Sequence, residues 1–167
     1  KAEDLQKISE GIGVFGNYKE AESQEFGSNW FNNVKVTYSS QDIKWTYSPV
    51  KYWLPQGHID FLAYAPYDAT IALKKKDATE TALTCIDFKV DKKIADQKDL
   101  LWANAANKTK DNISSTNNKV KFQFAHALSR LGFTVKLKKE PSTDATIMLT
   151  NIKLAGSTDG TSKSAFY

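Results

Sequence analysis

Residues 45–67, WTYSPVKYWLPQGHIDFLAYAPY, constrain the fold more than any other part of the chain. In the second half of this stretch, residues 59–65 are apolar at nearly every position, so hydrophobic side chains occupy both the odd and the even positions. Successive side chains of a β-strand point to opposite faces of the sheet, and a strand that is apolar at both parities must be covered on both faces. We therefore expect residues 59–65 to form an interior strand of a β-sheet.

The segment that leads into this stretch shows a different pattern. Ile43, Trp45 and Tyr47 share one parity, and polar residues occupy the positions between them. Such alternation predicts a strand with one buried and one solvated face, which would place these three side chains in the core. The polar residues 39–42 are typical of a hairpin turn that joins this strand to a preceding strand at residues 34–38.

Similar alternation recurs along the chain, whereas no long segment has the i, i+3, i+4, i+7 spacing of an amphipathic helix. We predict an all-β fold, a two-sheet antiparallel β-sandwich of about seven or more strands. A closed barrel is the alternative, because alternation alone does not distinguish a barrel from a sandwich. A chain of 167 residues is long enough for one domain with a substantial core, so we expect a single domain, residues 1–167. Further strands are expected at residues 12–15, 86–90, 120–124, 131–137 and 147–154, and exposed loops at residues 20–29 and 104–118.

The charge of the chain argues against nucleic acid as a partner. The formal net charge is only +4, and Arg130 is the single arginine among 23 cationic residues. Proteins that read nucleic acids usually bring arginine for bidentate contacts with bases and phosphates. No apolar run reaches the length of about 18 residues that a transmembrane helix needs, so we expect no transmembrane segment.

Residues that commonly carry catalysis or bind metals are few and are not spaced for either task. We expect Cys85 to be a small buried residue of a strand and His126 to lie in the core or at a turn. We therefore predict no catalytic residues, no metal site and no cofactor. Several aspartates lack the D-x-D-x-D-G spacing of a calcium loop and are expected to be solvated at the surface: Asp60, Asp68, Asp87, Asp91, Asp96 and Asp99.

Aromatic side chains at the turn within residues 45–67 offer the best candidate surface for a ligand or partner. Exposed Trp and Tyr side chains stack on sugar rings or anchor protein contacts. Because Trp45 and Tyr47 fall on an apolar parity, Tyr52 and Trp53 are the candidates for such contact.

Four blocks of the sequence resemble, in order, the segments of the fimbrillin (Mfa-like) family, the fimbrial subunits and related surface lipoproteins of Gram-negative anaerobes. The first is WTYSPVKYWLPQGHIDFLAYAPYDA at residues 45–69. The second joins DFKV at residues 87–90 to QKDLLWA at residues 97–103. The third is VKFQFAHALSRLGF at residues 120–133, and the fourth is IMLTNIKLAGSTDG at residues 147–160. The ordered series is specific, although each block alone is weak.

The resemblance implies a transthyretin-like Greek-key β-sandwich, the N-terminal domain of a longer two-domain subunit. It also implies export as a lipoprotein to the outer-membrane cell surface or a fimbrium (pilus), with other fimbrial subunits as partners. Assembly in the family is expected to proceed by strand complementation, after an arginine-specific protease removes an N-terminal strand. This sequence departs from that pattern, since Cys85 is not a lipobox cysteine and the cations of the N-terminal segment are lysines: Lys1, Lys7 and Lys19.

Two hypotheses about function follow. In the first, the chain is a non-catalytic structural and adhesive subunit of a cell-surface fimbria, which assembles by β-strand complementation and meets host proteins or glycans. In the second, it is a cell-surface glycan-binding module that uses its turn aromatics, Tyr52 and Trp53. We favour the first, because the family resemblance covers most of the chain.

Overall fold

The computed structural model of the chain describes residues 2–20, 25–138 and 146–150. The chain divides into two compact units, Lys1–Leu128 and Ser129–Tyr167. All the helices and strands of the described residues belong to the first unit. They are α1 (Ala2–Leu5), β1 (Ile12–Lys19), β2 (Phe31–Ser39), β3 (Lys44–Thr46), β4 (His58–Ala65), the 3₁₀ helix η1 (Ile94–Asp96), β5 (Leu101–Lys108), the 3₁₀ helix η2 (Ser114–Thr116) and β6 (Ala125–His126).

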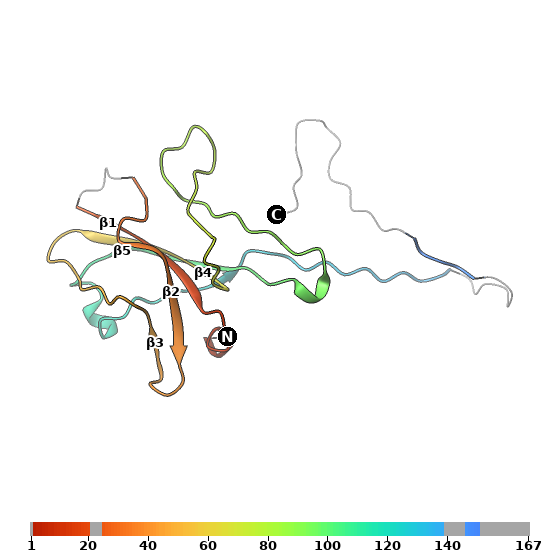
Figure 1. The fold of residues 1–167 in the computed structure, drawn as a ribbon, viewed down its shortest axis with the longest axis horizontal. Coiled ribbons are helices and arrows are strands. Elements are labelled where there is room, and N and C mark those ends of the chain that lie inside the picture. Colours follow the sequence, from red (N-terminus) through yellow and green to blue (C-terminus); the bar gives the residue numbers. More distant parts are fainter. Residues whose placement is uncertain (1, 21–24, 139–145, 151–167) are drawn as a thin grey trace. The chain divides into compact units, whose positions relative to one another are not determined.

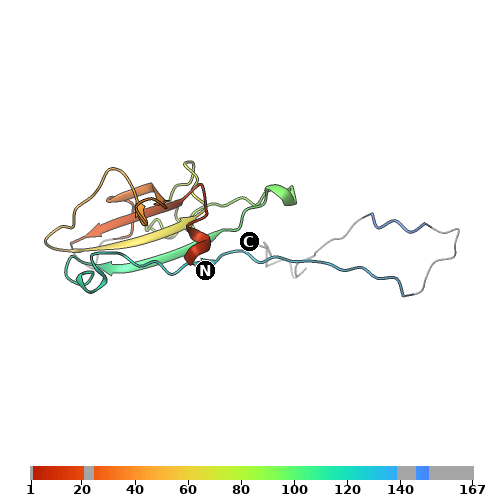
Figure 2. The ribbon, with the colours of Figure 1, turned by 90° about the horizontal axis from the view of Figure 1, so that it is seen from below.

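The strands of the first unit form one six-stranded antiparallel sheet in the order β3-β2-β1-β4-β5-β6 (Figures 1 and 2). The prediction of an all-β fold is thereby confirmed. The sheet is open, with β3 and β6 at its two edges, so the closed barrel is not what this sheet forms. β4 lies in the interior between β1 and β5, as the apolar residues 59–65 predict.

Both faces of β4 are buried, and each face has its own cluster. On the first face, Phe61 and Ala63 pack with Val14 of β1, and Tyr47, Trp53 and Phe122 cover them. On the second face, Phe15 of β1 packs with Tyr64, and the covering residues come from the segment between β4 and β5: Ile71, Leu73, Ile86 and Phe88. Irregular segments on both sides therefore satisfy the two-sided apolar pattern of the strand.

A glycine on β1 allows the second face to close around Tyr64. Gly13 is paired with Tyr64, and a Cβ atom at Gly13 would clash with the Cε1 atom of the tyrosine ring. The tyrosine hydroxyl lies 2.7 Å from Asn33 Oδ1 and 2.8 Å from the carbonyl oxygen of Asp68. Burial raises the pKa of the Tyr64 hydroxyl, which keeps it protonated as a hydrogen-bond donor. The ring thus ties β4 to β2 and to the loop that follows β4.

The expectation that Ile43 and Trp45 lie in the core is wrong. β3 begins only at Lys44, and Ile43 belongs to the preceding turn with φ +54°, so its side chain leaves the alternation of the strand. Ile43 is 78% exposed, and Trp45 lies at the sheet edge against Tyr38, with ring centroids 5.4 Å apart. Tyr47 does pack on the first face, where its ring centroid lies 5.5 Å from that of Phe31.

Three further segments have apolar side chains on the sheet as predicted, or a strand where none was predicted, so the predicted and observed strands differ. Residues 104–118 do not form one loop, because β5 continues through Lys108. Residues 86–90 and 120–124 are not strands of the sheet. Apolar side chains of both segments still pack against it, namely Ile86, Phe88, Val120, Phe122 and Phe124, whereas Val90 is exposed. Hydrophobic periodicity indicates an apolar face, whereas a strand also needs a hydrogen-bonded neighbour.

The described part of the second unit, residues 129–138 and 146–150, forms no helix or strand. Leu131, Phe133, Val135 and Leu137 are each more than half exposed there. The alternation that predicts a strand at residues 131–137 is therefore present as a row of apolar side chains without a paired strand. Residues 151–154 of the last expected strand lie outside the described residues.

Gly13→Ala should lower the free energy of unfolding by about 1–3 kcal/mol, because the added methyl group forces the Tyr64 ring out of its place. Chemical denaturation measures the change. Gly27→Ala is the matched control, since a Cβ atom there would meet only Asn17 Oδ1 at 3.5 Å, an ordinary contact. Equal stability of the two variants would contradict this account of the second face.

Candidate functional site

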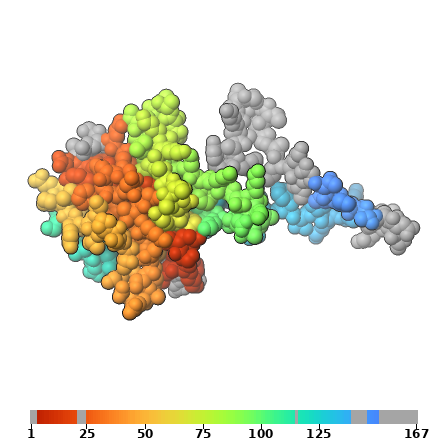
Figure 3. All heavy atoms as spheres, in the orientation of Figure 1, coloured from red at the N-terminus to blue at the C-terminus, as the bar shows by residue number. Residues whose placement is uncertain are grey.

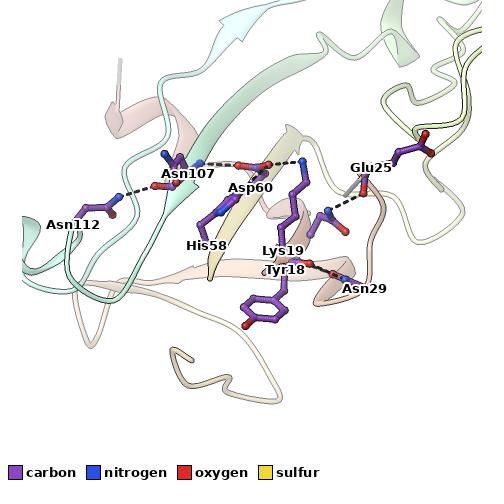
Figure 4. Close-up of polar contacts among 9 residues, drawn as sticks. Tyr18, Lys19, Glu25, Asn29, His58, Asp60, Asn107 and Asn112 are labelled. Carbon is purple, nitrogen blue, oxygen red and sulfur yellow. Dashed lines mark hydrogen bonds and ion pairs between the residues drawn. The ribbon is translucent and has the colours of Figure 1, made fainter. Parts of the chain in front are cut away.

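The most organised polar group of the first unit lies where β1 ends, β4 begins and β5 ends (Figure 4). Lys19 Nζ lies 3.1 Å from Asp60 Oδ2, and His58 Nε2 lies 3.8 Å from the same oxygen. The backbone N–H of Asn107 donates to Asp60 Oδ1 at 2.7 Å. Strand pairing assembles the group, because Lys19 is the register partner of His58 and the β4–β5 register shifts between Ile59 and Phe61.

The expectation that Asp60 is solvated at the surface is wrong, since its side chain is largely buried in this group. Burial acts to raise the pKa of the Asp60 carboxyl, but the Asn107 N–H and the Lys19 ammonium together outweigh it, so the pKa lies below its usual value of 3.8. The sequence signal was a charged residue within an otherwise apolar strand, which indicates a paired charge.

Asp60 also holds the loop that follows β5. Asn107 has φ +53°, and its carbonyl oxygen accepts a hydrogen bond from Asn112 Nδ2 at 2.6 Å. One residue beyond Asn112, the side chain of Ile113 is 2% exposed and closes the loop onto the sheet. The group of Lys19, His58, Asp60 and Asn107 therefore fixes a turn of the chain, and it contains no nucleophile poised beside a base.

Tyr52 and Trp53, the two residues predicted to contact a ligand or partner, differ in their surroundings. Tyr52 is 82% exposed. Trp53 is half-buried and packs edge-on against Phe61, with ring centroids 6.4 Å apart. Close by, Lys51 Nζ lies 4.9 Å from the centre of the Trp30 ring. The contact role of both residues stays a prediction, and the structure brings only Tyr52 fully to the surface.

His126 is not in the core, because it lies exposed on the edge strand β6 and its Nδ1 contacts the carboxylate of Asp99. Cys85 is partly buried. Its backbone pairs with that of Lys74 in an isolated antiparallel β-bridge, so it does not lie within a strand. No group of three or more potential metal ligands gathers within residues 2–20, 25–138 and 146–150. Over the same residues, no helix has the length and apolar character to span a membrane.

A groove of about 740 Å³ runs between α1 and the segment that ends in β6. Its apolar wall includes Leu5, Ile8, Phe122 and Phe124. Charged residues of both signs stand along it, among them the ion pair of Lys98 with Glu10. His126 of β6 also lines the groove, and β6 is an edge strand that is paired only with β5.

A second, smaller hollow lies over the second face of the sheet and is called the apolar pocket below. It has a volume of about 240 Å³, and its lining is almost entirely apolar. Its wall is formed by Leu62, Tyr64, Leu73, Ile86 and Trp102. Trp102, which lines the pocket, is also 47% exposed to solvent.

A family model described as Fimbrillin-like matches residues 3–165, which is nearly the whole chain. No curated protein and no solved structure matches it.

Asp60→Asn should lower the free energy of unfolding at pH 7 by about 1–3 kcal/mol. The substitution removes the negative charge that pairs with Lys19, and it replaces the charged acceptor of the Asn107 N–H by a weaker, neutral one. The folded-state pKa of Asp60 is lowered, so its stabilising contribution is present above pH 3.8 and is lost as the pH falls through the folded-state pKa. Denaturation of both proteins at pH 7 and near pH 2 measures this difference.

The two stability curves should converge at the lower pH. Asp111→Asn serves as the control, because its side chain is exposed and its replacement should change stability little at either pH. A constant difference between wild type and Asp60→Asn across the pH range would show that the carboxylate charge is not what stabilises the turn.

Proposed function

The chain belongs to the fimbrillin-like family, and we propose that it is a non-catalytic structural subunit of a cell-surface fimbria that assembles with other fimbrial subunits. The observation that carries the proposal is the family match over residues 3–165. The all-β architecture with two open sheet edges agrees with it, since a subunit built this way can extend its sheet with a strand from elsewhere.

In this proposal the subunit assembles by β-strand complementation. The second unit supports this, because Leu131, Phe133, Val135 and Leu137 form an exposed apolar row on a segment without a paired strand in the described residues. A row at every second residue is what a strand presents when it adds to a groove, with backbone hydrogen bonds giving affinity and alternate side chains filling pockets. In the first unit, the groove between α1 and β6 offers an apolar wall, and β6 is an edge strand of the sheet.

The finer architecture belongs to the same proposal. We take residues 1–167 as one transthyretin-like Greek-key β-sandwich, the N-terminal domain of a two-domain subunit exported as a lipoprotein to the outer-membrane surface of a Gram-negative cell. The coverage of both faces of the sheet supports a layered arrangement, because the residues over the second face are themselves apolar at alternate positions.

Val135→Asp should abolish polymers, because a charge in the apolar row cannot enter an apolar groove. The full-length protein and its proteolytically trimmed form are mixed, and filaments are counted by negative-stain electron microscopy. Lys136→Asp is the matched control, since it adds the same side chain on the opposite, polar parity.

Both variants should keep the folded monomer, because Val135 is exposed and does not support the core. Filaments formed equally by the Val135→Asp variant would exclude this row from assembly. No filaments from the wild-type protein in any trimmed form would count against the fimbrial function itself.

A glycan-binding module is the second candidate, and the exposure of Tyr52 favours it. A fully exposed tyrosine can stack on the apolar face of a sugar ring. If this is the function, a glycan array should give a positive signal that Tyr52→Ala weakens at least tenfold, a loss of about 1.4 kcal/mol. Val50→Ala, on the same loop, is the control, and a signal that survives Tyr52→Ala would rule out this surface.

A further inference from the structure

We propose that the β2–β3 hairpin of one copy of this chain inserts Ile43 into the apolar pocket of the next copy. The hairpin tip is defined here as Ile43 with its neighbours Tyr38 and Trp45. This inference rests on the proposed fimbrial function and names one contact between its subunits. Neither the family match nor the strand complementation proposed above assigns a role to either surface.

Both the backbone conformation and the exposure of Ile43 are unfavourable for an isoleucine. Its φ of +54° is in the left-handed region, which glycine and asparagine adopt readily and β-branched residues avoid. Its side chain is also 78% exposed, so burial in its own fold does not offset the strain. An outlier of this kind points to a role of the side chain outside the fold.

The hairpin holds Ile43 in a defined place. Ser39 Oγ donates to Asp42 Oδ2 at 3.1 Å, and the backbone N–H of Asp42 donates back to Ser39 Oγ at 3.2 Å. Ser39 and Lys44 close the loop as a strand pair, and the Tyr38 and Trp45 rings meet edge-on behind it. Figure 3 shows this orange hairpin projecting from the lower side of the first unit. The tip is thus an ordered apolar projection.

The apolar pocket complements the tip in size and chemistry. An apolar cavity of about 150 Å³ can hold a benzene ring. The pocket of about 240 Å³ is therefore large enough for an isoleucine side chain, and its lining is almost entirely apolar. Trp102 lines the pocket and is partly exposed, so it can pack against Trp45 of the tip.

The charges around the two surfaces also match. Asp42 and Lys44 flank Ile43 in sequence, and their side chains form an exposed ion pair at 4.0 Å. Beside the pocket, Lys74 and Asp87 form a second exposed ion pair, and each is adjacent in sequence to a residue of the pocket wall. On contact, Asp42 can face Lys74 while Lys44 faces Asp87, so each pair exchanges partners across the interface.

The contact is heterologous, because the tip and the pocket are different surfaces of one chain. β3 lies at one edge of the sheet, whereas the pocket lies over β1, β4 and β5, and β2 separates β3 from these strands. A heterologous contact leaves a free tip at one end of a pair and a free pocket at the other, so further copies can add at both ends, and the assembly grows as an open filament when the rotation between copies does not close a ring. This is the geometry that a polymeric subunit needs.

The test uses the full-length protein under conditions in which it forms filaments. Two variants are made in a Cys85→Ala background, one with Ile43→Cys and one with Thr84→Cys at the pocket wall. Within residues 1–167 each variant carries one cysteine, so a disulfide between two such cysteines joins two copies. Mixed filaments should give at least tenfold more disulfide-linked dimer than either variant alone. Tyr52→Cys mixed with Thr84→Cys is the control, because Tyr52 is as exposed as Ile43 but lies on another loop.

Ile43→Asn provides a second readout that separates contact from folding. Asparagine tolerates the left-handed backbone, so the melting temperature should rise by about 2–4 °C. The concentration needed for filaments should rise about tenfold or more, because one buried apolar side chain is lost from each contact. If Ile43 only supported the fold of its own subunit, the Ile43→Asn substitution would not weaken assembly while it stabilises that fold.

Cross-linking of the mixture together with weaker assembly of Ile43→Asn supports the proposal. Filaments that form normally without the disulfide between the Ile43→Cys and Thr84→Cys copies overturn it and leave the fimbrial function intact. An apolar pocket filled by another segment of the same chain would give that result. Absence of filaments under every condition overturns both the contact and the fimbrial function.

Discussion

The two-sided burial of β4 is the constraint on which the rest of the structure depends. An interior strand with apolar side chains on both faces needs cover on both, and the chain supplies it from segments that are not strands. The same requirement explains Gly13, which makes room for the Tyr64 ring, and the covering segments that wall the apolar pocket. Partial cover on the second face leaves the pocket, and with it a surface that another apolar side chain can fill.

The burial of the central strands was predictable from the sequence, because alternation and two-sided apolar runs directly encode which side chains avoid water. Residues 59–65 follow that rule. Ile43 does not, since a turn with positive φ ends the alternation one residue before β3 begins. β5 was not predicted, because its buried residues Ala103 and Ala105 carry little hydrophobic signal among asparagines. The pairing of strands depends on residues that are distant in the sequence, and the periodicity of each segment does not show which strands will lie side by side.

The candidate sites were likewise predictable from the sequence only in part. Asp60 was expected to be solvated although it is a charge within an apolar strand, and its partners Lys19 and Asn107 come from strands far away in the sequence, so only the fold brings them together. Of the two residues predicted to contact a ligand or partner, Tyr52 is exposed, whereas Trp53 packs against Phe61, and the contact itself stays a prediction. The hairpin tip was invisible to parity, which assigned Ile43 and Trp45 to the core. Only the structure singles out the hairpin tip, because it shows the β-branched Ile43 with a positive φ, which such residues avoid.

The central claim is that the chain is a subunit of a surface filament, and electron microscopy of intact cells labelled with gold-conjugated antibodies against residues 1–128 tests it most directly. The account predicts gold along or at the ends of surface filaments, and no such labelled filaments on cells that lack the gene. Gold spread over the cell envelope, with filaments unchanged when the gene is absent, would contradict it.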